Sequence, residues 1–341
     1  MDIKSAIRQI TTGHNLSGED METVMQDIMT GACTQAQIAG FLIGLQMKGE
    51  TVDEITAAAR VMRSLSARVE VNMEFLVDTC GTGGDSSNTF NISTTAAFVT
   101  AAAGARVAKH GNRSVSGQCG SSDVLEAAGI KFDLTPDQVA GCINEIGIGF
   151  MFAPLHHNAM KYAAGPRKEL GVRTIFNLLG PLTNPASAPN QVIGVFDDAW
   201  LEIMANVLKL LGSRHVMIVH AENGMDEISI SGNTRVAELR EGQVNSYSID
   251  PETFDIPSGD INLICVNNIE DSLNMMHSVL NNEGGPAKDI VIMNAGAAIY
   301  TSGVADSLAD GINRARLAIE SGAAKIKLDE LVRFTQSIKS T

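Results

Sequence analysis

At 341 residues the chain is longer than a single hydrophobic core, which usually stops growing near roughly 250 residues, so two domains are predicted. A net charge of −14 disfavours nucleic-acid binding, and the lack of a signal-like N-terminus or long apolar run predicts a cytoplasmic protein without membrane contact. The five scattered cysteines form no C-x-x-C pair, which argues against disulfides and a zinc site.

The chain up to residue 65 is predicted to form four short helices. Three of them begin at patterns that resemble capping boxes, Ser17-x-x-Asp20, Thr34-x-x-Gln37 and Thr51-x-x-Glu54. Apolar residues recur at helical spacing after the second and third of these patterns. A small helical unit is therefore expected at the beginning of the chain.

From about Val71 the pattern changes to short apolar runs, each followed by a loop and a helical stretch, which is typical of an α/β fold. Strands are predicted at 75–77, 106–108, 191–196, 215–220, 235–239 and 261–266. Helices are predicted at 93–103, 121–128, 201–211, 272–280, 290–300 and 306–321. The segment 154–189 is rich in Pro, Gly and Asn, which favours a crossing between domains over a continuation of the sheet.

A glycine-rich loop, Gly81-Thr82-Gly83-Gly84-Asp85, follows the first predicted strand. Its glycines let backbone amides approach an anion, although the spacing matches neither the P-loop nor the dinucleotide fingerprint. A simple tight turn explains this loop alone equally well. The helix start just behind it, at Asn91, Ser93 and Thr94, favours a bound phosphate, because free N–H groups and the positive end of the helix dipole meet there.

A second polar loop runs from Lys109 to Gly117 after a neighbouring strand, at the edge where α/β sheets place ligands. Its cations, Lys109 and Arg113, suit an anionic ligand, whereas isolated Lys and Arg residues are usually solvated surface. His110 is more typical of a packed histidine than of a catalytic base.

Two further segments carry candidate binding residues, one for a metal ion and one for a carboxylate. Asp226 and Glu227 supply the hard oxygen ligands that Mg²⁺ takes, and a phosphate site in an acidic chain needs such a cation, although acidic pairs are common on surfaces. The fork of Arg167 can pair with a carboxylate, although a structural arginine is as consistent with this segment. His156 and His157 lack an evident third metal ligand.

The segments GTGGD, TFNIST, KHGNRSVSG, GPRKELGVRTIFNLLGPLTNP and GMDEIS follow one another in this order. Together they closely resemble the anthranilate phosphoribosyltransferase family over nearly the whole chain. The resemblance implies a small N-terminal helical domain, residues 1–66 with a returning segment near 168–190. It also implies a large α/β domain, residues 71–341, with a central, mainly parallel sheet similar to that of nucleoside phosphorylases, and an active site between the two domains.

The same resemblance implies transfer of the 5-phosphoribosyl group from 5-phosphoribosyl 1-diphosphate to the amine of anthranilate, in tryptophan biosynthesis. Mg²⁺ is the implied cofactor, with Mn²⁺ as a substitute, and the chain is expected to form a homodimer through its helical domain. Association with an anthranilate synthase subunit is left open by the sequence. Because the amine is neutral and nucleophilic at pH 7, positioning and stabilisation of the leaving diphosphate are expected to suffice, with inversion at C1′.

The resemblance assigns residues to each ligand. Metal binding falls to Ser93, Asp226 and Glu227, and anthranilate binding to Gly81, Asn112 and Arg167. A catalytic base is not assigned, and His110 is a minor alternative for that role. Gly117 and Asn158 depart from the serine and proline that are more usual in the family. Phosphoribosyl diphosphate is assigned to Gly81, Gly84, Asp85, Thr89, Asn91, Ile92, Ser93, Thr94, Lys109, His110, Gly111, Asn112, Arg113, Ser114, Val115, Ser116, Gly117 and Ser121.

Two other classes of function are weighed against this one. A pyrimidine-nucleoside phosphorylase would carry K-H-S-T-G-G, which this chain lacks. A nucleic-acid-binding relative that has lost catalysis would need a basic groove, which the charge of −14 opposes.

Overall fold

The computed structural model describes residues 1–85, 87–113 and 119–338. Its N-terminal part is a helical bundle of α1 (Ile3–Thr11), α2 (Gly18–Thr30), α3 (Gln35–Lys48) and α4 (Val52–Ser64). The hydroxyl oxygens of Ser17, Thr34 and Thr51 each accept an N–H from the first turn of the next helix. The predicted helix starts are confirmed, because each cap satisfies a backbone donor that the helix itself leaves free.

A buried ion pair stabilises the bundle from inside. Lys48 Nζ lies 2.8 Å from Glu54 Oε2, and the two side chains are only 3% and 0% exposed. Glu54 also accepts the backbone N–H groups of Leu16 and Thr51, each at 2.9 Å. This single carboxylate therefore joins the chain before α2 to the beginning of α4.

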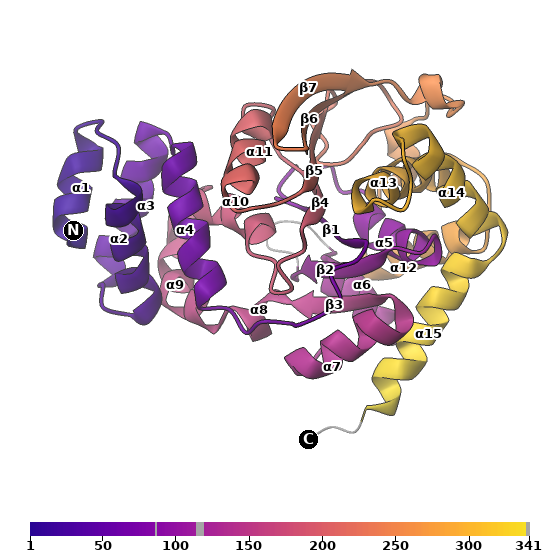
Figure 1. Ribbon diagram of the computed structural model, residues 1–341, viewed down its shortest axis with the longest axis horizontal. Helices are drawn as coiled ribbons and strands as arrows, with labels where there is room; N and C mark the ends of the chain where they lie inside the picture. The colour runs from indigo at the N-terminus through magenta and orange to yellow at the C-terminus, as the bar shows by residue number, and fades with distance from the viewer. Residues whose placement is uncertain (86, 114–118, 339–341) are drawn as a thin grey trace.

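The segment 153–182, for which no helix is predicted, is largely helical. It forms α8 (Ala153–His156), the 3₁₀ turn Asn158–Met160, α9 (Lys161–Leu170) and α10 (Ile175–Leu182). Apolar residues of α9 and α10, among them Ala163, Ile175 and Leu179, are buried in the same cluster as the bundle core. Figure 1 shows α9 beside α2 and α3, at the far side of the molecule from α14 (Leu308–Glu320) and α15 (Ala323–Ser337).

The described residues form one seven-stranded sheet in the order β3-β2-β1-β4-β5-β6-β7. The first five of these strands are parallel, whereas β6 and β7 pair antiparallel. The chain order reverses between β1 and β4, whose last residues, Gly81 and Gly194, are register partners. Ligands of open α/β sheets bind beyond the carboxyl ends of strands at such a switch point. The strands are β1 (Leu76–Gly81), β2 (Arg106–Gly111), β3 (Ile148–Phe152), β4 (Asn190–Gly194), β5 (His215–Ala221), β6 (Thr234–Arg240) and β7 (Gln243–Ile249).

Helices cover both faces of the sheet (Figure 1). On one face α5 (Ile92–Ala102) and α13 (Pro286–Ser302) pack directly on β1, and α14 (Leu308–Glu320) and α15 (Ala323–Ser337) pack outside them. On the other face α11 (Trp200–Leu210) packs on β5 and β6. Further elements of this part of the chain are α6 (Ser121–Ala127), α7 (Pro136–Gly141), the π-helical turn Cys142–Ile146, the 3₁₀ turn Pro251–Phe254 and α12 (Ile269–Leu280).

The strand predicted at 261–266 is wrong. Ile261–Ile264 form a 3₁₀ turn, which begins where the Asp260 side chain accepts the N–H of Asn262. Only Cys265 pairs in strand fashion, in an isolated bridge with Thr89. The apolar run reflects partial burial, since Ile264 and Val266 are buried while Leu263 is exposed.

Candidate active site

Glycines close the carboxyl ends of β1 and β4, and the segment that carries Asp226 lies directly across them. A Cβ on Gly194 would fall 1.5 Å from the backbone oxygen of Asp226, and one on Gly81 would fall 2.5 Å from Asp226 Oδ2. The N–H of Thr82 donates to the carbonyl oxygen of Gly194 at 2.9 Å. Because neither strand end carries a side chain, Asp226 can lie against the carboxyl ends of β1 and β4.

The amide of the glycine loop that was predicted to face a phosphate faces a carboxylate in this structure. The N–H of Gly83 donates to Asp226 Oδ2 at 2.9 Å. Gly83 and Gly84 have φ angles of +66° and +79°, where a Cβ is strained, so glycine is required for this path. Asp85 belongs to the same cluster, since its Oδ2 accepts the backbone N–H of Asp226, with the nitrogen 3.5 Å away.

A second carboxylate lies at the N-terminus of α5. The N–H of Ser93 donates to Glu227 Oε1 at 3.2 Å, while Asn91, which precedes the helix, makes no side-chain cap. Free amides and the helix dipole favour negative charge at this position. The two predicted anion sites, in the glycine loop and at α5, are thus each bound to one member of the Asp226-Glu227 pair.

Lys109 forms the floor of this site from β2. Its side chain is buried, and Nζ donates to the carbonyl oxygen of Thr79 and lies 3.3 Å from Ser93 Oγ. Burial lowers the pKa of Lys109, and the carboxylates of Asp78 and Glu227 oppose that shift. Lys109 is therefore joined through Ser93 to Glu227, and hence to the Asp226-Glu227 pair, by hydrogen bonds.

The carboxylates raise one another's pKa values. Burial and repulsion by Asp85 raise the pKa of Asp226 to about 7, and burial and repulsion by Asp226 raise the pKa of Glu227 to about 8. A divalent cation would relieve this repulsion. Within residues 1–85, 87–113 and 119–338 no three His, Cys, Asp or Glu side chains form a ready metal site. The residues fit Mg²⁺, which takes one or two carboxylates and completes its shell with water and substrate phosphates.

Asn91 connects the beginning of α5 to the end of the second loop. Its Oδ1 accepts from Ser272 Oγ at 2.8 Å and from Cys119 Sγ at 3.1 Å. Its Nδ2 donates to the carbonyl oxygen of Cys119 at 3.3 Å, and Ser272 also accepts the Asn91 N–H. Ser272, from α12, therefore fixes the orientation of this predicted site residue.

The other predicted site residues between β1 and α5 differ in which of their atoms a ligand can reach. Thr89 Oγ1 lies 3.4 Å from Ser87 Oγ, which in turn donates to Asp85, so Thr89 is joined to the acidic cluster. Thr94 is buried, and its Oγ1 has no partner among the described residues. The side chain of Ile92 packs in the core, so only its backbone is available to a ligand.

The second loop begins with a close contact to α6. A Cβ on Gly111 would lie 2.3 Å from Ser121 Oγ, which donates to the carbonyl oxygen of Asn112. The Arg113 guanidinium pairs with Asp123 at 2.7 Å and with Glu126 at 2.9 Å, so its charge is engaged by α6 in this structure. The predictions for Ser114, Val115, Ser116 and Gly117 lie outside the described residues.

His110 has the surroundings of a packed histidine. It is buried, its backbone N–H donates to Asp78 Oδ1 at 3.1 Å, and its ring lies edge-on to that of His157, with ring centroids 5.2 Å apart. Burial, together with the neighbouring His157, lowers the pKa of His110 to about 3. A group with that pKa is neutral at pH 7 and a weak proton acceptor, which disfavours a role as general base.

Arg167 stands apart from these residues on α9. Its guanidinium lies 5.3 Å from the centroid of the Phe176 ring, and burial lowers its pKa. Among the described residues it makes no ion pair, which leaves its fork available to a carboxylate. Among the described residues, no hydrogen bond or ion pair joins the Arg167 side chain to Gly81 or Asn112, the other two residues assigned to anthranilate.

Sequence reasoning missed Gly194, Arg173 and Ser272. Gly194 was detectable, because it lies near the end of the strand predicted at 191–196, just as Gly81 and Gly111 closely follow the strands predicted at 75–77 and 106–108. Arg173 donates to the carbonyl oxygen of Gly84 and lies in a segment already quoted for the resemblance, yet only Arg167 was singled out there. Ser272 gave no signal, since its role depends on a contact 181 positions away in the chain.

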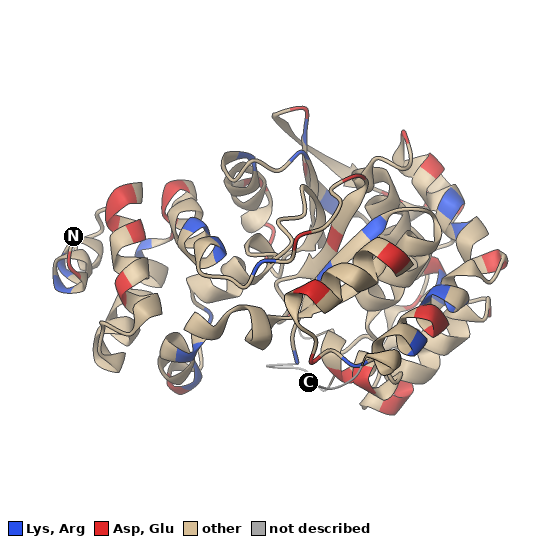
Figure 2. Cartoon of the chain, turned by 60° about the horizontal axis from the view of Figure 1, so that its bottom comes forward, with Lys and Arg blue, Asp and Glu red and all other residues tan. Residues whose placement is uncertain are grey.

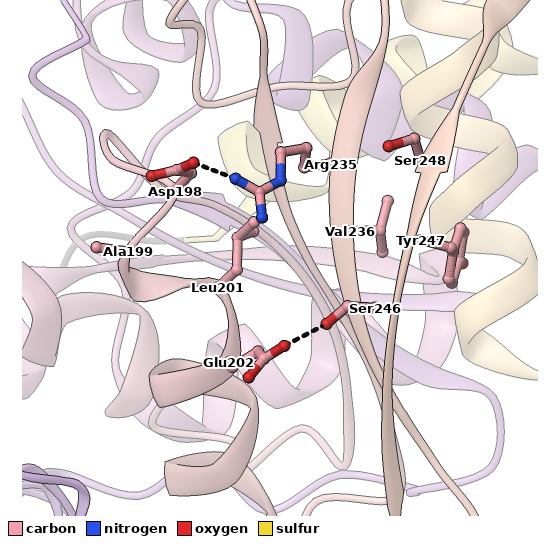
Figure 3. Close-up of a pocket in the computed structure, with 9 residues that line it drawn as sticks. All are labelled: Asp198, Ala199, Leu201, Glu202, Arg235, Val236, Ser246, Tyr247 and Ser248. Carbon is pink, nitrogen blue, oxygen red and sulfur yellow. Dashed lines mark hydrogen bonds and ion pairs between the residues drawn. The ribbon is translucent and has the colours of Figure 1, made fainter.

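Other surface features lie away from this site. A cavity of about 330 Å³ is lined by residues of β6, β7 and the start of α11. Figure 3 shows its lining residues, among which Arg235 is paired with Asp198 and Ser246 with Glu202. In Figure 2, Lys and Arg are interspersed with Asp and Glu rather than gathered into a stripe. In the part of the chain that the structure describes, the helices all fall short of the length and apolarity that crossing a membrane requires.

The fold and the site define a two-domain glycosyl transferase. Residues 4–66 match the family described as "Glycosyl transferase family, helical bundle domain", and residues 73–325 match "Glycosyl transferase family, a/b domain". Within this class the chain belongs to the anthranilate phosphoribosyltransferase family. The resemblance read from the sequence motifs is thereby confirmed.

Individual relatives cover the chain almost completely. The anthranilate phosphoribosyltransferase of Thioalkalivibrio sulfidiphilus is 62% identical over 337 residues, which span 99% of this chain and all of that protein. The crystal structure of the Thermus thermophilus enzyme is 40% identical, covers 97% of this chain and 99% of its own, and has a TM-score of 0.93. The Saccharomyces cerevisiae enzyme in complex with PRPP and Mg is 24% identical, covers 98% of both chains, and shares the fold with a TM-score of 0.89.

Proposed function

We propose that this chain transfers the 5-phosphoribosyl group of 5-phosphoribosyl 1-diphosphate to the amine of anthranilate, giving N-(5-phosphoribosyl)anthranilate and pyrophosphate in tryptophan biosynthesis. One observation carries the proposal most directly. Two adjacent carboxylates, Asp226 and Glu227, lie on the amides of Gly83 and Ser93 with Lys109 beside them. Such a set suits a diphosphate that arrives with a divalent cation.

In this proposal the chain positions the reactants and stabilises charge. The amides of Gly83 and Ser93, which donate to Asp226 and Glu227 in this structure, would turn to the diphosphate once those carboxylates bind the cation. Lys109 would lie beside the diphosphate, and Arg167 would hold the carboxylate of anthranilate. Mg²⁺, bound by Ser93, Asp226 and Glu227, would neutralise charge that develops on the leaving diphosphate. The amine nitrogen forms the new bond to C1′ as the bond from C1′ to the diphosphate oxygen breaks, and the nitrogen then loses its proton to solvent.

A fluorescence assay tests this function. Anthranilate fluorescence should fall when the purified chain is mixed with 5-phosphoribosyl 1-diphosphate and Mg²⁺, and pyrophosphate should appear in equal amount. Omitting the metal or the phosphoribosyl donor should prevent both changes. If fluorescence persisted with every divalent ion tried, the proposed reaction would be overturned.

Replacing Arg167 with alanine should weaken anthranilate binding selectively. A charge-assisted hydrogen bond from arginine to a carboxylate contributes roughly 1.5–3 kcal/mol, so KM for anthranilate should rise about 10- to 100-fold. The dissociation constant of 5-phosphoribosyl 1-diphosphate, measured without anthranilate, should change little, since among the described residues no hydrogen bond or ion pair joins Arg167 to the glycine loop. Lys168→Ala removes a neighbouring exposed charge and serves as the control. Equal loss of affinity for both substrates would contradict the proposed role.

We further propose the finer features that the sequence resemblance implies. The helical domain comprises residues 1–66 with the returning segment near 168–190, and the α/β domain comprises residues 71–341. The chain is proposed to act in the cytoplasm as a homodimer joined through the helical domain, with Mn²⁺ able to replace Mg²⁺. The yeast relative in complex with PRPP and Mg supports the choice of metal. The ligand-binding residues assigned from the sequence are proposed as its substrate contacts, including Ser114 to Gly117.

A further inference from the structure

An arginine joins the segment that carries Arg167 to the glycine loop. Arg173 follows α9 by three residues, and its guanidinium donates to the carbonyl oxygen of Gly84. The same guanidinium lies over the ring of Phe196, 4.0 Å from its centroid. Arg173 therefore binds the glycine loop through a hydrogen bond, and its planar guanidinium stacks on Phe196, which follows β4.

The residue beneath Arg173 also holds the glycine loop. The N–H of Phe196 donates to Thr82 Oγ1 at 3.1 Å, and the N–H of Thr82 donates to Gly194 at 2.9 Å. The loop is thus held from β4 on one side and from the segment between α9 and α10 on the other. Arg173 supplies the second of these attachments.

We propose that Arg173 is a positioning residue that couples binding of the acceptor to binding of phosphoribosyl diphosphate. This inference rests on the proposed function of the site. An acceptor carboxylate on Arg167 restricts the segment 167–173, and Arg173 transmits that restriction to the glycine loop through Gly84. Coupling between two binding sites is reciprocal, so a donor that orders the loop restricts the acceptor segment by the same free energy.

Because Arg173 lies at the surface, the coupling can be tested by replacing this residue. Its side chain is exposed, in contrast to the buried residues of α10 that follow it, so its removal leaves the core packing intact. Arginine combines a planar stacking face with a hydrogen-bond donor, whereas lysine keeps the charge and a donor but not the planar face. Arg173→Lys should therefore retain part of the effect.

Steady-state kinetics provide the first test, with Lys168→Ala as the matched control for lost charge. In Arg173→Ala the KM values for both substrates should rise about three- to tenfold, as expected for losing one exposed charge-assisted hydrogen bond and one exposed cation–π contact. Arg173→Lys should lie between wild type and alanine. A purely structural role would lower the active fraction, and hence kcat, at unchanged KM, and that result would overturn the proposal.

Hydrogen exchange provides a second test that needs no turnover. Adding 5-phosphoribosyl 1-diphosphate with Mg²⁺ should slow amide exchange in residues 161–182 of the wild-type chain and of Lys168→Ala. In Arg173→Ala this protection should be lost. Equal protection in wild type and Arg173→Ala would overturn the coupling, whereas absence of turnover by the wild-type chain would contradict the proposed function alone.

Discussion

Replacing Asp226 with asparagine and Glu227 with glutamine should lower kcat/KM by at least about a hundredfold, because a Lewis-acidic ion contributes several kcal/mol to charge stabilisation. The dependence of the remaining rate on Mg²⁺ concentration should shift to higher concentration or disappear. Titrations with Mg²⁺ and with Mn²⁺ on wild type and variant measure this change. An unchanged titration curve would count against these two residues as metal ligands.

The same replacement should make the metal-free protein more stable at pH 8. The pKa values of Asp226 and Glu227 are raised to about 7 and about 8, so between pH 4 and pH 8 the folded chain binds more protons than the unfolded chain. The free energy of unfolding therefore falls as pH rises through that window. Urea unfolding at pH 5 and pH 8, without metal, should show a smaller decrease in the variant than in wild type. An equal decrease in the free energy of unfolding in both proteins would show that Asp226 and Glu227 do not cause the pH dependence.

Lys48→Met should destabilise the helical bundle by about 3 kcal/mol or more, because removing one partner of a buried pair leaves an uncompensated charge. The Glu54 carboxylate would remain, 0% exposed, with only hydrogen bonds to stabilise it. Urea denaturation followed by circular dichroism measures the loss. Adding Glu54→Gln should restore part of it, which a double-mutant cycle resolves.

The matched control is an ion pair near the surface. Lys327 and Glu330 lie 2.9 Å apart in α15, with side chains 27% and 33% exposed. Because exposed pairs contribute at most about 1 kcal/mol, Lys327→Met should change stability little. A loss for Lys48→Met no greater than that of Lys327→Met would show that burial of the pair does not govern its energy.

The local signals of the sequence predicted much of the fold. Side-chain caps at Thr34 and Thr51 identified helix starts, because the capping interaction involves residues only three positions apart. The strand β7 was missed because most of its residues are exposed at the sheet edge, so apolar alternation is absent. The helix α15 was also missed, and the apolar run 261–266 was mistaken for a strand.

The contacts that complete the site could not be predicted in the same way. The approach of Asp226 to Gly194 depends on which strands are neighbours, and the bond from Ser272 to Asn91 depends on where α12 packs. Neither contact can be recognised from residues that are neighbours in the sequence. Local patterns, a helix start, a polar loop after a strand and an acidic pair, brought Ser93, Lys109 and Glu227 into the prediction, and the family motifs then assigned them ligands. Arg173 became visible only through its bond to Gly84.

The carboxylates that lie on the amides of Gly83 and Ser93 have a consequence for selectivity. Inorganic phosphate, or any phosphate ester without a divalent ion, would have to displace these carboxylates and accept their repulsion. A diphosphate that carries its own cation converts the same repulsion into coordination. The resting chain should therefore discriminate among cellular anions by the metal they bring, and ordinary phosphate metabolites should be poor competitors for its active site.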